Sequence, residues 1–162
     1  MMNTPSSKEL WMQQLSKCLR MDEGVRNKAY DDATGQEVKA PSGRLTIGVG
    51  RNIEDNGISE ATITQMLNED IEHCLREAQR FFGLDFFNSL STPRQHAILM
   101  MIFQLGAAGF FEFRNTIAAI KQNNFALAAE HARKSLWARQ VPDRARRVTT
   151  LLESEVYLWN KM

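Results

Sequence analysis

The segment from Ala97 to Phe103 constrains the fold most strongly, because every one of its residues is apolar. A helix that is apolar on all faces is stable in water only when other elements surround it. Thr92 and Pro93 precede the segment as a helix cap and a first-turn proline, and Gly106 follows it as a break. We therefore expect a central buried helix inside a mostly helical lobe.

The bulk composition favours one globular domain and excludes several classes of protein. With 162 residues, 43% hydrophobic and 24% charged, the chain can form one domain with a real core. Its net charge of +1 gives no general attraction to nucleic acid or membranes. No run approaches the roughly 18 apolar residues of a membrane span. We expect a single domain over residues 1–162.

The first twenty residues are too polar for the apolar core of a signal peptide. They include charged and amide side chains at Lys8, Glu9, Gln13, Gln14, Lys17 and Arg20. We expect the protein to stay in a reducing cytoplasm until another protein gives it a route out. Cys18 and Cys74 lie at apolar positions of helical patterns, and we expect them to be buried and unbridged.

Other potential sites give little signal. His73 and His96 occur singly in helical patterns without ligand partners at metal spacing, so no metal site is expected. The chain has no Ser-His-Asp order, glycine-rich phosphate loop or Cys-x-x-Cys motif, and we expect no cofactor.

Two long helices are predicted on either side of an irregular segment. Ser6-Ser7-Lys8-Glu9 reads as a capping box, and the helix after it should run to about Asp22 and end at Gly24. A second helix should open at Ser59-Glu60, reach about Phe82 and bridge two lobes. Shorter helices are expected at 110–113, 116–121 and 125–135, and a last one from 142 or 143 to about 160.

Residues 24–58 have short runs and no helical period, which predicts a small β lobe. We expect a hairpin with strands near 28–30 and 44–49, joined by a polar excursion at 34–43. The remaining residues, 1–23 and 59–162, should form the helical lobe. The fold class is thus α+β and mostly helical, with two lobes and a cleft between them.

The helix-to-hairpin junction carries a set of side chains suited to glycoside hydrolysis. Glu23 ends the first helical pattern, Asp31 and Asp32 end a short extended run, and Thr46 begins the next strand. Hydrolysis of a glycosidic bond needs one acid to protonate the leaving oxygen and a second to support water or positive charge.

These residues resemble the catalytic set of the bacteriophage lysozymes, the muramidase endolysins of tailed phages. Glu23, eight residues, Asp32, and then Thr46 in a Leu-Thr-Ile-Gly-Val-Gly strand match the Glu/Asp/Thr pattern of that family. Further segments match in the family's order over roughly residues 17–160: Phe103–Gly106, Phe113–Thr116, Lys134–Trp137 and Pro142–Val148. The resemblance implies a lysozyme-like two-lobed fold.

The resemblance also assigns roles to the catalytic set. Glu23 is expected to be the general acid in a poorly solvated site, with Arg144 close to it. The family spacing selects Asp32 over Asp31 as the ionised partner, and the resemblance favours inversion with Thr46 placing the water. The gap of fourteen positions from Asp32 to Thr46 exceeds that of relatives. Loops tolerate insertions, so Thr46 should return to the same place.

Six further residues correspond to family positions near or under the substrate: Phe103, Thr116, His131, Trp137, Gln140 and Arg144. Phe103 and Trp137 could equally be plain core residues, and His131 stands where relatives can carry a sugar-contacting asparagine. The resemblance also predicts an ion pair between Arg51 and Asp70 that ties the β lobe to the second long helix.

The function implied is a muramidase that hydrolyses the β-1,4 bond between N-acetylmuramic acid and N-acetylglucosamine in phage-driven lysis. The expected partner is bacterial peptidoglycan, reached through a holin-type membrane protein, and the enzyme should be a monomer. A lytic transglycosylase and a non-catalytic wall-binding module are alternatives. The six basic residues between Arg133 and Arg147, against one acid, also leave open a nucleic-acid binder, although the near-neutral charge of the chain disfavours it.

Overall fold

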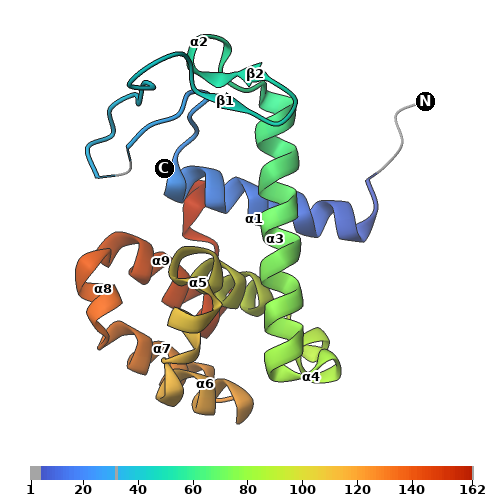
Figure 1. The fold of residues 1–162 in the computed structure, drawn as a ribbon. Coiled ribbons are helices and arrows are strands. Elements are labelled where there is room, and N and C mark those ends of the chain that lie inside the picture. The colour runs from blue at the N-terminus through green and yellow to red at the C-terminus, as the bar shows by residue number, and fades with distance from the viewer. Residues whose placement is uncertain (1–4, 32, 162) are drawn as a thin grey trace.

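The computed structural model describes residues 5–31 and 33–161. It is 69% helical with a small two-stranded antiparallel sheet, which confirms the predicted α+β, mostly helical, lysozyme-like fold. Helix α3, Glu60–Phe82, runs from the lobe that holds the sheet down along the helical lobe (Figure 1). The predicted bridging helix is therefore present.

Helix α5, Thr92–Phe111, is the central helix that the apolar segment predicts. Residues 97–102 are all buried, and Phe103 is half-buried. Gly106 interrupts the helix with φ 70° and ψ 160°, a conformation that favours glycine. Ser91, rather than Thr92, is the N-cap residue.

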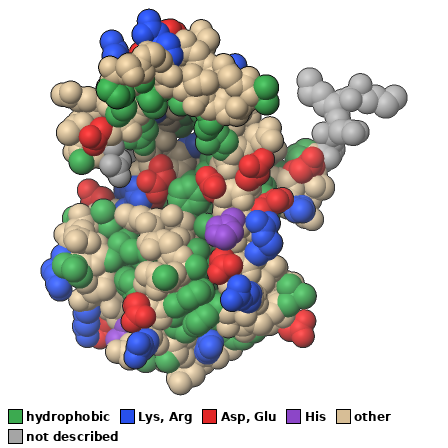
Figure 2. Space-filling view, in the orientation of Figure 1, with side chains coloured by type: hydrophobic (Ala, Val, Ile, Leu, Met, Phe, Trp, Pro, Cys, Tyr) green, Lys and Arg blue, Asp and Glu red, His purple; other side chains and the backbone are tan. Residues whose placement is uncertain are grey.

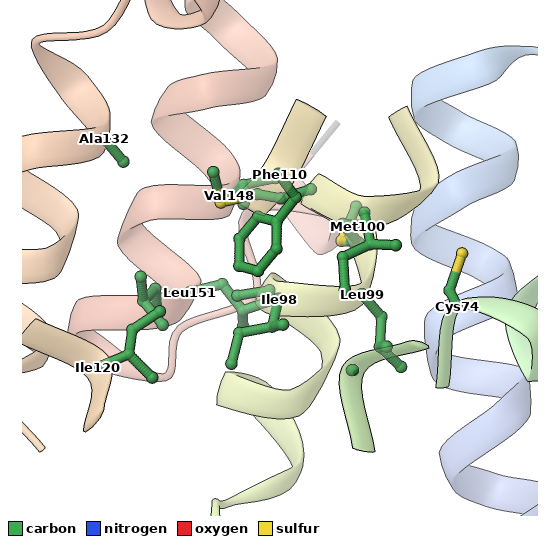
Figure 3. Close-up of a cluster of buried hydrophobic side chains, with 14 of the residues drawn as sticks. Cys74, Ile98, Leu99, Met100, Phe110, Ile120, Ala132, Val148 and Leu151 are labelled. Carbon is green, nitrogen blue, oxygen red and sulfur yellow. The ribbon is translucent and has the colours of Figure 1, made fainter. Parts of the chain in front are cut away.

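The other helices cover α5 on several sides. Figure 3 shows side chains of α5 among those of neighbouring helices, with labels on Ile98, Phe110, Ile120, Val148 and Leu151. Helix α5 packs chiefly against α3 and against α9 (Pro142–Ser154). The remaining short helices of this lobe are α4 (Leu84–Ser89), α6 (Arg114–Lys121), α7 (Phe125–Arg133) and α8 (Leu136–Gln140). Helix α9 ends earlier than expected, because Glu155 adopts a left-handed conformation, and the 3-10 helix η1, Leu158–Lys161, follows.

Helix α1, Ser7–Glu23, begins and ends at the predicted signals. Ser6 and Glu9 form the capping box, and the Gly24 N–H closes the last turn on the carbonyl of Arg20. The helix buries Leu15, Cys18 and Leu19. Its last two residues, Asp22 and Glu23, therefore meet the rest of the molecule at a fixed position.

Both cysteines are buried and unbridged, as predicted. Burial raises the pKa of the Cys18 thiol to about 12 and that of the Cys74 thiol to about 11. Both thiols are therefore protonated at neutral pH and are poor nucleophiles.

The hairpin differs from its prediction. Strand β1, Thr46–Ile47, pairs with strand β2, Arg51–Asn52, so the hairpin turns inside the segment expected to be one strand. Gly48 and Gly50 flank the tip with φ of 60° and 75°, which permits this tight turn. Tyr30 instead forms an isolated bridge with Glu37. The short helix α2, Ile53–Asn56, follows β2.

The predicted ion pair between Arg51 and Asp70 is wrong. Arg51 donates from Nε to the Gly57 carbonyl at 3.0 Å, and no ion pair joins it to Asp70 among the described residues. A different arginine, Arg20 of α1, binds the start of α3. Its Nη1 lies 2.6 Å from Glu60 Oε1, and its Nη2 donates to Thr64 Oγ1 at 2.8 Å.

In the described part of the chain, no single helix has both the length and the apolar composition needed to cross a membrane. Helices α5 and α6 meet that test only when taken together across a bend of 103°, by length and composition alone.

Candidate active site

Glu23 is the last residue of α1, and an arginine of α9 binds it there. Arg144 donates from Nη1 to Glu23 Oε1 at 2.7 Å, and its Nη2 donates to the backbone carbonyl of Asp22. The Glu23 side chain is 38% exposed, against 15% for Arg144. The predicted proximity of Arg144 to Glu23 is therefore confirmed, whereas the prediction of a poorly solvated site is wrong, because Glu23 is exposed.

A buried carboxylate lies directly behind this pair. The Asp22 side chain is 1% exposed, and its Oδ1 accepts hydrogen bonds from Arg147 Nη2 and from Trp159 Nε1, the latter at 3.1 Å. Sequence reasoning missed Asp22, Arg147 and Trp159. The partners of Asp22 lie 125 and 137 positions away in the chain, so no local pattern could reveal them.

Glu23 lines a cavity of about 220 Å³ between α1, α3, α5 and the β lobe. Phe103, one of the predicted substrate contacts, lines the same cavity. Its remaining walls are mostly apolar, with polar groups from Arg20, Arg26, Tyr30 and Asp70. Figure 2 shows the surface hollowed between the two lobes, with acidic and basic side chains at the border of the hollow.

A second and larger cavity, of about 790 Å³, brings together four predicted substrate contacts: Thr116, His131, Trp137 and Gln140. Trp137 is buried, and its Nε1 donates to Gln104 Oε1 at 2.9 Å. The Trp137 ring also meets Phe113 edge to face at 6.1 Å. Gln104 therefore fixes the orientation of the indole that forms one wall of this cavity. The sequence did not single out Gln104 as a site residue.

Thr46 is exposed on β1, and its Oγ1 donates to the Arg44 carbonyl at 3.0 Å. It is not among the residues that line the Glu23 cavity. The role of Thr46 in placing water therefore stays a prediction.

Asp32 lies outside the described residues. Its rival Asp31 is engaged in a turn, where Oδ1 accepts the N–H groups of Ala33 and Thr34 at 2.8 and 3.2 Å. This turn ties up the Asp31 carboxylate locally, and the selection of Asp32 stays a prediction. Over the same described ranges, no group of three His, Cys, Asp or Glu side chains is arranged to hold a metal ion.

A helical lobe, a small β lobe and a glutamate that ends the first helix in the hollow between them define the lysozyme class of protein. The model of the phage lysozyme family matches residues 20–152. The chain therefore belongs to the phage lysozyme family, and it is a peptidoglycan hydrolase of the lysozyme type.

Relatives in different organisms share the match. A probable T4-type lysozyme 2 of Dictyostelium discoideum is 26% identical, over 86% of this chain and 94% of that protein. The pre-baseplate central spike protein Gp5 of Enterobacteria phage T4 is 26% identical, over 85% of this chain and 27% of the spike protein. The peptidoglycan hydrolase gp36 of Pseudomonas phage phiKMV is 30% identical, over 80% of this chain and 14% of that hydrolase. The chain thus spans only a part of each of these two phage proteins.

Proposed function

We propose that the protein is a muramidase that hydrolyses the β-1,4 bond between N-acetylmuramic acid and N-acetylglucosamine. The observation that carries the proposal is the Glu23 carboxyl group, which Arg144 holds at the end of α1 in the cavity between the lobes. Glu23 is the general acid and donates its proton to the glycosidic oxygen. Because Arg144 bonds Oε1, we assign the transferred proton to Oε2.

The attacking water comes from the opposite face of the sugar. We assign Asp32, in its ionised form, as the base that takes a proton from this water, and Thr46 as a hydroxyl that orients it. A separation of more than about 6.5 Å between the two carboxyl groups leaves room for the water and gives inversion at the anomeric carbon.

The larger cavity suits the glycan strand next to the cleaved bond. Trp137 is buried and its N–H is satisfied by Gln104, so the indole supports the wall of this cavity from beneath and leaves no buried donor unpaired. We assign His131 and Gln140 to hydrogen bonds with substrate in this cavity, and Phe103 to apolar contact beside Glu23. Thr116 is buried, and we assign it to support of the cavity wall.

The biological setting we propose is host lysis at the end of a phage infection. The enzyme acts as a monomer, remains in the host cytoplasm, and reaches the wall when a holin-type membrane protein opens a route. Phage T4 carries its similar sequence in a protein named as a spike. Detection of the chain in purified virions would therefore favour mounting on the particle over release from the cytoplasm.

The variant Glu23→Gln tests the assignment, because an amide keeps the shape of the side chain and cannot donate the proton. We expect release of new reducing ends from purified peptidoglycan to fall by at least about a hundredfold, the lower range for loss of a general acid. The control is Glu69→Gln, the same change on α3, where Glu69 accepts from its neighbour Gln65 one turn away. Wild-type activity in Glu23→Gln would reject the proposal.

A further inference from the structure

Asp22 is a buried carboxylate that the hydrolytic mechanism does not itself use. Its Oδ1 accepts from Arg147 and Trp159, and its Oδ2 lies 3.9 Å from Arg144 Nε, at the limit of an ion pair. Arg144 also donates to the Asp22 backbone carbonyl while it holds Glu23. One carboxylate thus adjoins two cations, and one of these cations touches the proton donor.

The hydrogen bonds of this network are incomplete. Among the described residues, Asp22 Oδ2 and Arg147 Nε have no hydrogen-bond partner, although both atoms are buried. Buried charged groups are normally fully hydrogen-bonded when they serve stability alone. The unpaired atoms of Asp22 and Arg147 therefore lower the stability of the fold. A local loss of stability of this kind is typical of residues that serve a functional site, and here the neighbouring residue is Glu23.

Glu23 adjoins several cationic side chains. Arg144 is bonded to it and Arg26 lines the same cavity, as does Arg20, whose charge is paired with Glu60. Asp70 is the one other acid among the described residues that line the cavity. A nearby cation favours the charged form of a carboxyl group. A general acid must hold its proton until the substrate arrives, so these arginines oppose its task.

We propose that Asp22 is a positioning residue for Arg144 and balances its charge. With this counter-charge in place, Glu23 can hold its proton while Arg144 stays bonded to it. The negative charge of Asp22 offsets the combined field of Arg144 and Arg147 at Glu23. Trp159 and Arg147 of α9 hold the Asp22 carboxylate in position. The inference rests on the proposed role of Glu23 as the general acid.

Three variants test the inference through the titration of the Glu23 carboxyl carbon, followed by ¹³C NMR in labelled protein and assigned with Glu23→Gln. Asp22→Asn removes the negative charge, and we expect the midpoint to fall by about half a unit to one unit of pH. Arg147→Gln removes a positive charge, and the midpoint should rise by a similar amount. The double variant restores the charge balance and should return the midpoint to within about 0.3 units of wild type.

The pH dependence of reducing-end release gives the parallel functional readout. Its alkaline limb, where the general acid loses its proton, should move in the same direction as the NMR midpoint in each variant. A merely structural role for Asp22 would lower activity without opposite shifts in the two single variants.

The matched control is Glu153→Gln on α9, the helix that also carries Arg144 and Arg147. It removes the carboxylate partner of Arg133, the last residue of α7. Glu153 lies nine positions beyond Arg144, about 13 Å along the axis of α9. We expect no shift of the Glu23 midpoint in this variant.

Midpoints that stay at the wild-type value in folded Asp22→Asn and Arg147→Gln would overturn the inference. If Asp22→Asn fails to fold, Arg147→Gln gives the decision, because an unshifted midpoint in this folded variant also overturns the inference. The NMR readout needs no substrate. Full activity in Glu23→Gln would reject the proposed function, whereas unshifted midpoints with an inactive Glu23→Gln would reject only the role of Asp22.

Discussion

His96 is a fully buried residue of α5 that stays neutral in the folded protein. Its Nδ1 lies 2.7 Å from the Tyr157 hydroxyl, and its ring meets Trp11 edge to face at 4.7 Å. Burial lowers the pKa of His96 from 6.5 to about 4, more than the nearby Trp11 backbone raises it. The unfolded chain therefore binds a proton at this residue in a pH range where the folded chain does not.

This difference makes stability depend on pH. As the pH falls below about 6.5, the unfolded state gains a proton first, so the stability contributed by neutral His96 is lost between pH 6.5 and 4. From pH 7 to pH 4 the free energy of unfolding of the wild type should fall by about 3 kcal/mol more than that of His96→Gln. Denaturant unfolding at both pH values measures this difference.

The glutamine variant serves as its own control, because it can keep a hydrogen bond to Tyr157 and has no titrating ring. All other titrating groups are common to both proteins and cancel in the comparison. Equal losses of stability in the two proteins would show that His96 already carries a proton in the native state at pH 4 to 6.5.

At the scale of residues, the sequence indicated which side chains form the site better than it indicated what surrounds each side chain. The Glu23–Arg144 contact followed from the family motifs. The surroundings of His96, Asp22 and Gln104 did not, because their partners lie 61, 125 and 33 positions away in the chain. Such contacts arise from packing between helices, which spacing within one helix does not encode.

At the scale of elements, one carboxylate anchors the loop that leads into β1. Glu54 Oε2 accepts the N–H of Ala40 at 2.9 Å and that of Leu45 at 3.2 Å, directly before Thr46. Lys28 donates to the carbonyls of Glu54 and Asp55 at 2.8 and 2.9 Å. The two backbone N–H groups hold the pKa of Glu54 below its usual range. Glu54 thus joins both ends of loop 40–45 to helix α2.

The variant Glu54→Gln weakens this anchor, because an amide oxygen accepts less strongly than a carboxylate and its NH₂ group would face two donors. We expect the amides of Ala40 and Leu45 to exchange with deuterium at least about three times faster at pH 7. In the wild type, the protection of these amides relative to their intrinsic exchange rate should be lost on acidification below the ordinary pKa of a glutamate, since the lowered pKa of Glu54 keeps the anchor charged above it.

Glu37→Gln is the matched control, because Glu37 and Glu54 line one cavity of the β lobe, and the contact described for Glu37 is a backbone bridge to Tyr30, outside loop 40–45. Exchange at Ala40 and Leu45 that is unchanged in Glu54→Gln would mean that the loop holds its shape without this carboxylate.

Long helices were predictable and the hairpin was not. The bounds of α1 and α3 followed from capping residues, periodic apolar positions and terminal glycines. The hairpin was misplaced because residues 44–49 read equally well as one strand or as half of a turn. Only the observed pairing of Thr46 with Asn52 decides between these two readings.

For the whole molecule, two separate cavities divide the expected substrate contacts. Glu23 and Phe103 line the smaller one, and Thr116, His131 and Trp137 line the larger one. The lobes and the cleft between them could be predicted from the change of pattern at residue 24 and again near residue 58. The grouping of side chains from α6, α7 and α8 into one cavity came only from the family resemblance, because nothing in their spacing implies it.

The chemical form of the product tests the central claim most directly. Hydrolysis by Glu23 with an activated water inserts oxygen from water at the anomeric carbon of N-acetylmuramic acid. We expect mass spectra of peptidoglycan digested in H₂¹⁸O to show reducing muramic acid ends that carry one ¹⁸O. Muropeptides with 1,6-anhydro ends and no ¹⁸O would contradict this, because they form when the sugar's own hydroxyl replaces water, as in a lytic transglycosylase.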